Sequence, residues 1–300
     1  MRTPYLFLSA VLGACGGGTY NQGGKIVTED TSVDDTGSDQ TEDTGDETED
    51  TAENEDTGDT EDTDIPEACI NNYHPIHIPG WSKTFTAEYE GSTSTVIIEG
   101  LGETDWNGET LYAYHDQNTD SEGLGWDVTS YVRCDEELGL LLVGWSGTYS
   151  AANALADLGF PPDVYNIDAT LTPPRNYLPP EFAVGGIGSW DMSYNLNMNI
   201  VGADGTPQQQ VRLTEGDFQE VGAQNPYDLP NGDTVEAYKV NISFTVTETS
   251  NPLASPSDGY IEQYWVKGLG MVKETYINPA DQSIILSKEL SSYSGISPIE

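Results

Sequence analysis

The feature that most constrains the fold is a pair of aromatic and β-branched runs separated by glycines near the C-terminus. Residues 260–266 and 271–277 flank Gly268 and Gly270. Runs of this kind on either side of a short glycine turn are typical of a β-hairpin, because glycine adopts the positive φ angles that tight turns need. The hairpin contains no catalytic motif, so it predicts a fold class and not an activity.

Earlier parts of the chain predict more strands of the same kind. From Trp81 onward, Phe85, Ala87 and Tyr89 alternate with Thr and Glu, which is the pattern of a strand with one solvated face. Asn107-Gly108 supplies another hairpin turn. Further strands are expected at residues 96–98, 111–114, 128–133, 140–145, 190–200, 209–213, 235–247 and 284–293. The predicted fold is all-β, either a curved antiparallel sheet or an open half-barrel.

In the middle of the chain, residues 151–180, the sequence predicts no central strand. Residues 151–158 are the one plausible short helix. Three Pro-Pro pairs follow between residues 161 and 180, and proline does not fit a central strand, so this stretch is expected to be an irregular connection. The sequences before and after this stretch have similar motifs in the same order, although the spacing differs. For example, Asn107-Gly108 in the first matches Asn231-Gly232 in the second. We therefore expect possible duplicated halves at residues 69–150 and 178–293.

An acidic, low-complexity segment precedes the predicted β domain, which we place at residues 65–300. The protein has 300 residues, 51 acidic against 10 basic, and a formal charge of -41. Eighteen of the acids lie between Glu29 and Asp64, where Lys and Arg are absent. With so few apolar side chains this segment cannot offset the entropy of ordering, so residues 15–64 are predicted to be a disordered tether. Carboxylates alternate at residues 56–64, but the run lacks the fixed turn frame of a calcium loop.

The first residues have the features of an export signal. Arg2 precedes an apolar run at residues 5–12, which is too short to span a bilayer. Residues 12–15, Leu-Gly-Ala-Cys, resemble a bacterial lipobox, which implies a signal peptide at residues 1–14 and a diacylated or triacylated, palmitate-bearing Cys15. A plain secretory signal is the alternative. Gly16 resembles the residue found in lipoproteins that leave the inner membrane, so we expect an outer-membrane location in the cell envelope, on either face.

Two cysteines remain when Cys15 is assigned to the lipid. Cys69 and Cys134 would lie in an oxidising compartment in an exported protein, and we favour a disulfide between them over two separate thiols. A disulfide between them would close a long loop of chain. By the chain-entropy model, such a bridge stabilises the folded state by about 4 kcal/mol.

Several short motifs resemble a known family. The motifs are Tyr73-His74-Pro75 with Gly80-Trp81, Pro179-Pro180 with Gly188-Ser189-Trp190, and the run Tyr-Trp-Val-Lys-Gly-Leu-Gly-Met-Val-Lys at residues 264–273. Together they resemble a TapB-like group of bacterial envelope lipoprotein domains. The resemblance implies a curved antiparallel sheet without an established activity. This chain departs from the pattern in the direct Gly80-Trp81 junction and in the long segment 151–177.

Catalytic and metal motifs are weak, and we expect no enzyme, no metal and no cofactor. His74 and His77, with His115 and Cys69, lack the spacing of a zinc site. The run Gly-Trp-Ser-Gly-Thr at residues 144–148 lacks the second glycine of a nucleophile elbow. Acidic residues on strands could act on a glycan, although alternating acids on a wet face need no such role; these residues are Glu88, Glu90, Glu99 and Glu109.

Aromatic residues are the remaining candidates for function. They could line the concave face of a curved sheet and hold an apolar ligand, although packing in the core is the commoner role of large aromatics. The candidate ligand-binding residues are Tyr112, Tyr114, Trp145, Trp190, Tyr194, Tyr264 and Trp265.

The sequence thus predicts an anchored envelope lipoprotein whose β domain binds or adheres without catalysis. Expected partners are the membrane, reached through the lipid, and an envelope protein. Carriage of a lipid or another hydrophobic ligand is the alternative. Nucleic acid is not expected as a partner, because the acidic domain repels it at long range.

Overall fold

A computed structural model describes residues 69–70, 72–89, 92–119, 125–150, 164–178, 189–249 and 256–299. The predicted signal peptide, Cys15, the acidic tether and the helix expected at residues 151–158 lie outside the described residues.

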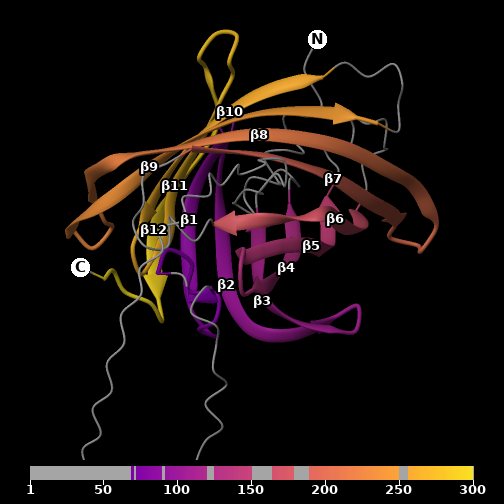
Figure 1. Ribbon diagram of the computed structural model, residues 1–300, viewed down its shortest axis with the longest axis horizontal. Helices are drawn as coiled ribbons and strands as arrows, with labels where there is room; N and C mark the ends of the chain where they lie inside the picture. The colour runs from indigo at the N-terminus through magenta and orange to yellow at the C-terminus, as the bar shows by residue number, and fades with distance from the viewer. Residues whose placement is uncertain are drawn as a thin grey trace, which may run out of the picture. The chain divides into compact units, whose positions relative to one another are not determined.

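The described residues form twelve β-strands (Figure 1). Their bounds are β1 Ser82–Tyr89, β2 Ser92–Trp106, β3 Glu109–Thr119, β4 Trp126–Asp135, β5 Gly139–Ser150, β6 Val164–Leu178, β7 Ser189–Gly202, β8 Pro207–Asp228, β9 Thr234–Glu248, β10 Ser257–Val266, β11 Gly270–Ile277 and β12 Ile284–Ser294.

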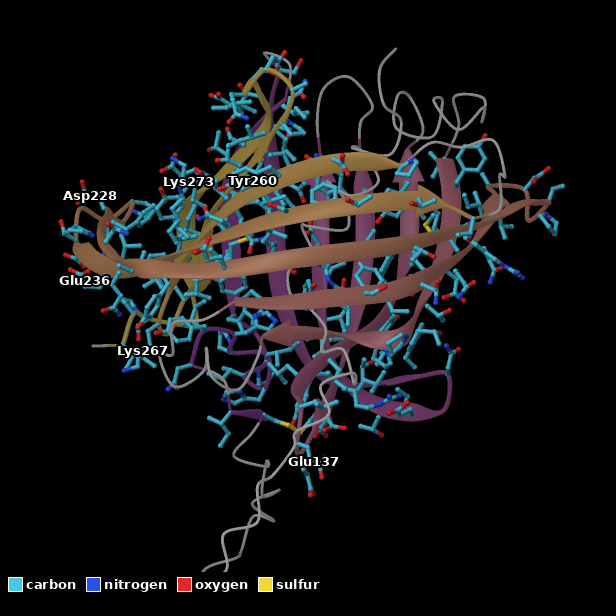
Figure 2. All side chains as sticks on the ribbon, turned by 45° about the horizontal axis from the view of Figure 1, so that its top comes forward. Glu137, Asp228, Glu236, Tyr260, Lys267 and Lys273 are labelled. Carbon is cyan, nitrogen blue, oxygen red and sulfur yellow. A yellow bond between two sulfur atoms is a disulfide. The ribbon has the colours of Figure 1, made fainter. Side chains whose placement is uncertain are left out.

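All twelve strands belong to one antiparallel sheet. Each strand pairs with the next along the chain, and β1 also pairs with β12, so the strands close into a barrel. The predicted all-β class and curved antiparallel sheet are confirmed, and pairing of β1 with β12 joins the two edges that a half-barrel would leave open. In Figures 1 and 2, β8 and β9 run across β1 and β2 at a steep angle.

The turn chemistry of the sequence explains the hairpins. Asn107 and Gly108 both have positive φ, at 54° and 83°, which matches the favoured two-residue hairpin turn. Between β10 and β11, Gly268 has a φ of 84° and Gly270 a φ of 79°. A side chain at Gly268 would also meet the backbone oxygen of Ser297. The hairpin expected at residues 260–277 is confirmed.

One expectation about the middle of the chain is wrong. Residues 164–178 form β6, which pairs with both β5 and β7, although Pro173 and Pro174 lie within it. Proline fits here because the ladder is interrupted: pairing with β7 ends at Thr172, and the register with β5 shifts between Leu142 and Gly144. A proline without an N–H group is tolerated at such an irregularity.

The lead-in segment, residues 72–80, covers part of the interior before β1 begins. Tyr73, His74 and Ile76 are buried in it. The Gly268 N–H donates to the Asn72 carbonyl oxygen at 2.6 Å, which ties the segment to the β10–β11 turn. The His74 ring lies edge-on to Tyr114, with centroids 5.7 Å apart.

No helix among the described residues has the length and apolarity needed to cross a membrane.

Candidate functional site

A disulfide joins the lead-in side of the domain to the sheet. The structure pairs Cys69 with Cys134, as the sequence predicts, with their Cα atoms 5.5 Å apart. Cys134 lies near the end of β4, one residue before the last of that strand. Figure 2 draws the bridge close to Glu137, in the turn between β4 and β5. The bond therefore fixes the point at which the chain arrives at the domain.

The predicted ligand-binding aromatics separate into buried and half-buried groups. Tyr114, Trp145 and Trp265 are no more than 2% exposed, and so is Tyr194. These four therefore pack in the core of the domain. Tyr112 and Tyr264 are half-buried, and Trp190 belongs to β7 but its side chain lies outside the described ones. A role in ligand binding stays a prediction for the set, and Tyr264 is the member best placed for it.

Five charged side chains are buried among the described residues: Arg175, whose guanidinium lies over the Tyr194 ring, and a group of four that interact with one another. Lys83, Asp116, Glu274 and Lys288 are at most 3% exposed. The Lys288 Nζ lies 2.9 Å from Glu274 Oε1. Burying an ion costs several kcal/mol unless it is paired and hydrogen-bonded. These residues are therefore the strongest departure in the described domain from an apolar core.

Hydrogen bonds extend the inner charge network along the strands. Gln263 donates from Nε2 to Glu274 Oε2 at 2.5 Å, and Trp265 donates from Nε1 to Gln263 Oε1 at 3.0 Å. Lys83 donates from Nζ to the carbonyl oxygens of Leu269 and Met271, each at 3.2 Å. β1 is thereby connected to the start of β11 through the interior.

Burial shifts the proton affinity of three groups in and beside this network. It lowers the pKa of Lys83 to about 7; Lys288 adds to the lowering and Asp116 opposes it. Burial raises the pKa of Asp116, against the effects of Lys288 and of a hydrogen bond from Trp126. The pKa of His74 is well below its usual value, through burial and then through Lys83 and His77. His74 is therefore neutral at pH 7.

A second ion pair lies on the outer face of the same two strands. Lys273 Nζ is 3.2 Å from Glu289 Oε2, and these residues directly precede and follow the inner pair in sequence. Lys273 pairs with Glu289 across the strands, and Glu274 with Lys288. A slip of one residue would exchange inner and outer side chains along a whole strand. The buried pair therefore specifies the register that presents the outer pair.

The outer side chains of this region form what we call the tyrosine face: Tyr227, Tyr260 and Tyr264 with the ion pairs Lys239–Glu262 and Lys273–Glu289. Lys239 and Lys273 are the cross-strand partners of Tyr264 on β9 and β11. Lys239 Nζ lies 2.6 Å from Glu262 Oε1. Figure 2 labels Tyr260 and Lys273 on this part of the sheet. All three tyrosines are half-buried, so their rings present both an apolar surface and a polar tip.

Tyr227 connects the far end of β8 to this face. Its ring is tilted against Tyr264, with centroids 6.0 Å apart, and its hydroxyl donates to Glu289 Oε1 at 3.2 Å. Burial, followed by the Glu289 charge, raises the pKa of Tyr227. The hydroxyl therefore remains protonated and a donor at neutral pH. The two lysines and two glutamates of the ion pairs balance each other in charge, and the carboxylate of Glu220 on β8 also acts on Tyr260.

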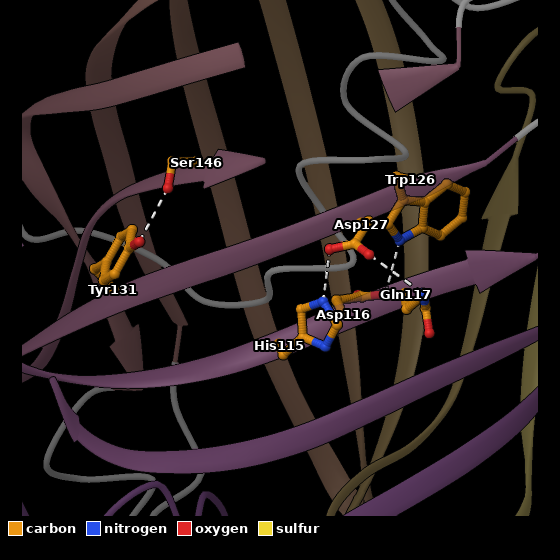
Figure 3. A network of polar contacts seen from close by, with 7 residues as sticks. All are labelled: His115, Asp116, Gln117, Trp126, Asp127, Tyr131 and Ser146. Carbon is orange, nitrogen blue, oxygen red and sulfur yellow. Dashed lines mark hydrogen bonds and ion pairs between the residues drawn. The ribbon is translucent and has the colours of Figure 1, made fainter. Parts of the chain in front are cut away.

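Another polar network lies on β3 and β4 (Figure 3). His115 Nε2 and Asp127 Oδ1 are 2.8 Å apart, and Gln117 donates to the other oxygen of Asp127 at 3.2 Å. Trp126 donates to the buried Asp116 at 2.7 Å. Because both oxygens of Asp127 are engaged, this network resembles a cross-strand clamp more than a catalytic dyad.

The residues considered for a metal site do not lie together in the structure. His74 is buried beside Trp81 and Tyr114, whereas His115 is bonded to Asp127, and Cys69 is in the disulfide. Among the described residues, no group of three or more His, Cys, Asp or Glu side chains is arranged to hold a metal ion.

Ser146 and Glu109, from the hydrolase and glycosidase interpretations, also have structural partners. Ser146 lies inside β5, 2.9 Å from the Tyr131 hydroxyl, and not at the strand-to-helix turn that a nucleophile elbow needs. Glu109 forms a bidentate pair with Arg133. Glu88 and Glu99 are exposed on β1 and β2, and Glu90 lies outside the described residues.

Sequence reasoning missed the inner network, although a signal was present. Lys83 occupies the same alternating phase as Phe85 and Ala87, the apolar positions of β1. Glu274 likewise falls between Val272 and Tyr276, which are both fully buried. A charged residue in the apolar phase of a strand predicts a buried ion that needs a partner.

Comparison with known proteins gives distant structural likenesses. No protein-family model matches the chain, and no curated protein matches it. One similar solved structure is described as a candidate exported protein with a YmcC-like fold from Bacteroides fragilis; it shares 13% identity over 72% of this chain and 96% of that one, at a TM-score of 0.45. Another is described as a candidate lipoprotein from Parabacteroides distasonis; it shares 12% identity over 75% and 99% of the two chains, at a TM-score of 0.42.

Proposed function

We propose that the chain is an exported lipoprotein, anchored through Cys15 in the outer membrane of a cell envelope, whose barrel binds a partner protein without catalysis. The Cys69–Cys134 disulfide supports export, because such bonds persist in oxidising compartments. The lipobox-like residues before Cys15 and the acidic spacer behind it support an anchored domain held away from the membrane.

The tyrosine face is the observation that carries the binding role. Interfaces between proteins are enriched in tyrosine and poor in uncompensated charge. In a chain with a formal charge of -41, two of the glutamates on this tyrosine-rich face are compensated by paired lysines. A partner can therefore approach it with less of the repulsion that the acidic remainder exerts on anions. An envelope protein is the partner that suits such a face.

Buried charges favour this role over carriage of a hydrophobic ligand. An apolar guest in the barrel would lie beside Lys83, Asp116, Glu274 and Lys288, which are all buried there. Separating those charges from their polar partners would cost several kcal/mol. The outer surface is therefore the better place for binding.

Replacing Cys15 with serine tests the anchor. We expect the wild-type protein, purified from membranes, to begin at Cys15 and to carry acyl mass. Reduction should add the mass of two protons from the Cys69–Cys134 bridge. The Cys15→Ser variant should lack acyl mass and leave the membrane fraction. Intact-mass spectrometry of both proteins decides this, and a wild-type protein without acyl groups would contradict the anchor.

Photo-crosslinking from Tyr264 tests the binding face. With a benzoylphenylalanine at position 264, we expect irradiated cells to yield one discrete protein adduct. The same group at Thr95, an exposed residue of β2, is the matched control and should give no such adduct. Adding Lys273→Glu should remove the adduct, because it breaks the local charge balance. Equal adducts from positions 264 and 95 would count against the tyrosine face.

A further inference from the structure

The outer surface of β6 and β7 carries a different set of side chains from the tyrosine face. We call it the amide–hydroxyl face and define it by the outward residues at positions 168–172 and 195–199, which alternate with buried core residues. Its members are Asp168, Thr170, Thr172, Asn195, Asn197 and Asn199. Asn197 is half-buried and the other five are exposed.

The strand register arranges this face as a grid. Asp168 is directly opposite Asn199, Thr170 is opposite Asn197, and Thr172 is opposite Asn195. Neighbouring strands lie about 4.8 Å apart, and outward residues of one strand repeat about every 6.8 Å. Polar groups therefore recur at regular intervals in two directions.

Hydrogen bonds hold one amide of the grid in a fixed orientation. Asn195 donates from Nδ2 to the carbonyl oxygen of Thr172 at 3.3 Å. Thr214, its neighbour on β8, donates from Oγ1 to Asn195 Oδ1 at 2.8 Å. An amide nitrogen has two hydrogens and an amide oxygen two lone pairs, so each group keeps bonding capacity for a ligand.

Strand propensity does not account for the three asparagines of this face. Asparagine is depleted in strands, on a propensity scale that spans about 1 kcal/mol, yet it occupies three alternate outward positions of β7. Threonine, tyrosine or lysine would suit a merely solvated strand better. On the tyrosine face of the same sheet, the polar groups that face the solvent include Lys–Glu pairs. β7 thus presents uncharged donors and acceptors at these positions despite the low strand propensity of asparagine.

We propose that the amide–hydroxyl face binds an uncharged polysaccharide. Sugar hydroxyls both donate and accept hydrogen bonds, and so do the amide and hydroxyl groups of this grid. The charge balance fits a neutral ligand, because the face holds one carboxylate, Asp168, and Arg212 lies opposite Asn197 on β8. Each hydrogen bond contributes about 1 kcal/mol, so a repeating ligand gains affinity from a repeating surface. This site is separate from the tyrosine face, so it adds an adhesive role to the proposed protein partner.

Affinity electrophoresis of the full mature protein in detergent tests the ligand class. Native gels would contain mannan, dextran, xylan or galactomannan as neutral probes, and alginate as an anionic one. We expect at least one neutral polymer to retard the protein. The apparent affinity should change less than twofold between about 0.05 M and about 0.5 M NaCl, because no charge pair is involved. Retardation by alginate alone, or by none of the polymers, would overturn the proposal.

Variants locate the binding to this face. Asn197→Lys and Thr170→Lys introduce charge on a cross-strand pair and should weaken binding at least tenfold. Asn197→Thr suits a strand better, so it should fold at least as well and still bind more weakly. Thr95→Lys, also an outward residue, is the matched control and should bind like the wild type.

Wild-type affinity in all three face variants would rule out the amide–hydroxyl face, whether or not the protein binds a polysaccharide elsewhere. The same measurements are repeated in a Cys15→Ser background, without the lipid anchor. Polysaccharide binding that still depends on this face there would support the inference even if the proposed anchor or the proposed protein partner proved wrong.

Discussion

Replacing Lys288 with methionine should lower the free energy of unfolding by about 3–5 kcal/mol, because it leaves the Glu274 carboxylate buried without its cation. Glu274 is 0% exposed and its Oε1 lies 2.9 Å from Lys288 Nζ. Gln263 would remain as its hydrogen-bond donor, and an amide does not neutralise a charge. Denaturation in urea, with the slope compared between proteins, measures the loss.

The outer pair on the same strands supplies a matched control. Lys273→Met removes the cation beside Glu289, whose side chain is 53% exposed, and should cost less than about 1 kcal/mol. In a double variant, Glu274→Gln combined with Lys288→Met removes both buried charges and should restore most of the stability. If the inner and outer lysine variants were equally stable, the buried pair would not have the role assigned to it.

Stability should rise with pH above neutrality, and Lys83 should be responsible for the rise. The pKa of Lys83 is lowered to about 7 by burial and by Lys288, while in the unfolded chain it returns to about 10.4. Between these values the unfolded state binds more protons, so the free energy of unfolding increases with pH by up to about 1.4 kcal/mol per unit. The penalty of burying the charged lysine is fully present below pH 7.

The Lys83→Met variant isolates this effect. The wild type should gain roughly 2–3 kcal/mol between about pH 7 and about pH 9.5, below the usual range of tyrosine titration, and the variant should gain little. The comparison between the two proteins is of how the free energy of unfolding changes with pH. A loss of stability that is the same at every pH, such as that from the missing hydrogen bonds to Leu269 and Met271, does not affect it. Lys267→Met, on a half-buried turn residue, should keep the wild-type profile. A parallel profile for Lys83→Met would show that another group causes the rise.

Local patterns were sufficient to predict the class of fold and the hairpins. The alternation around Phe85, the glycines after Val266 and the Asn107-Gly108 turn each act through backbone geometry over a few residues. The Cys69–Cys134 bridge followed from counting cysteines in a chain that the sequence predicts to be exported. Such signals depend on near neighbours in sequence, which is why they can be read without a structure.

Long-range pairings were beyond the same reasoning. Pairing of β1 with β12 joins residues about two hundred positions apart, and no local pattern specifies it. β6 was missed because Pro173 and Pro174 suggested a connection, while an interruption in the ladder accommodates them. For the candidate site, Tyr264 was identified as an aromatic, but its two lysine neighbours come from other strands and depend on register.

The position of the disulfide would have a mechanical consequence in a protein anchored as proposed above. Cys69 precedes the lead-in segment, so tension arriving from the N-terminal side passes through sulfur to Cys134 on β4. The disulfide would therefore relieve the contacts of residues 72–80 with the β10–β11 turn of part of this tension. From β4 the force spreads sideways through the hydrogen bonds of β5 to β6. A domain held at the amide–hydroxyl face would thus be pulled across β4, β5 and β6, which are bonded side by side in the sheet.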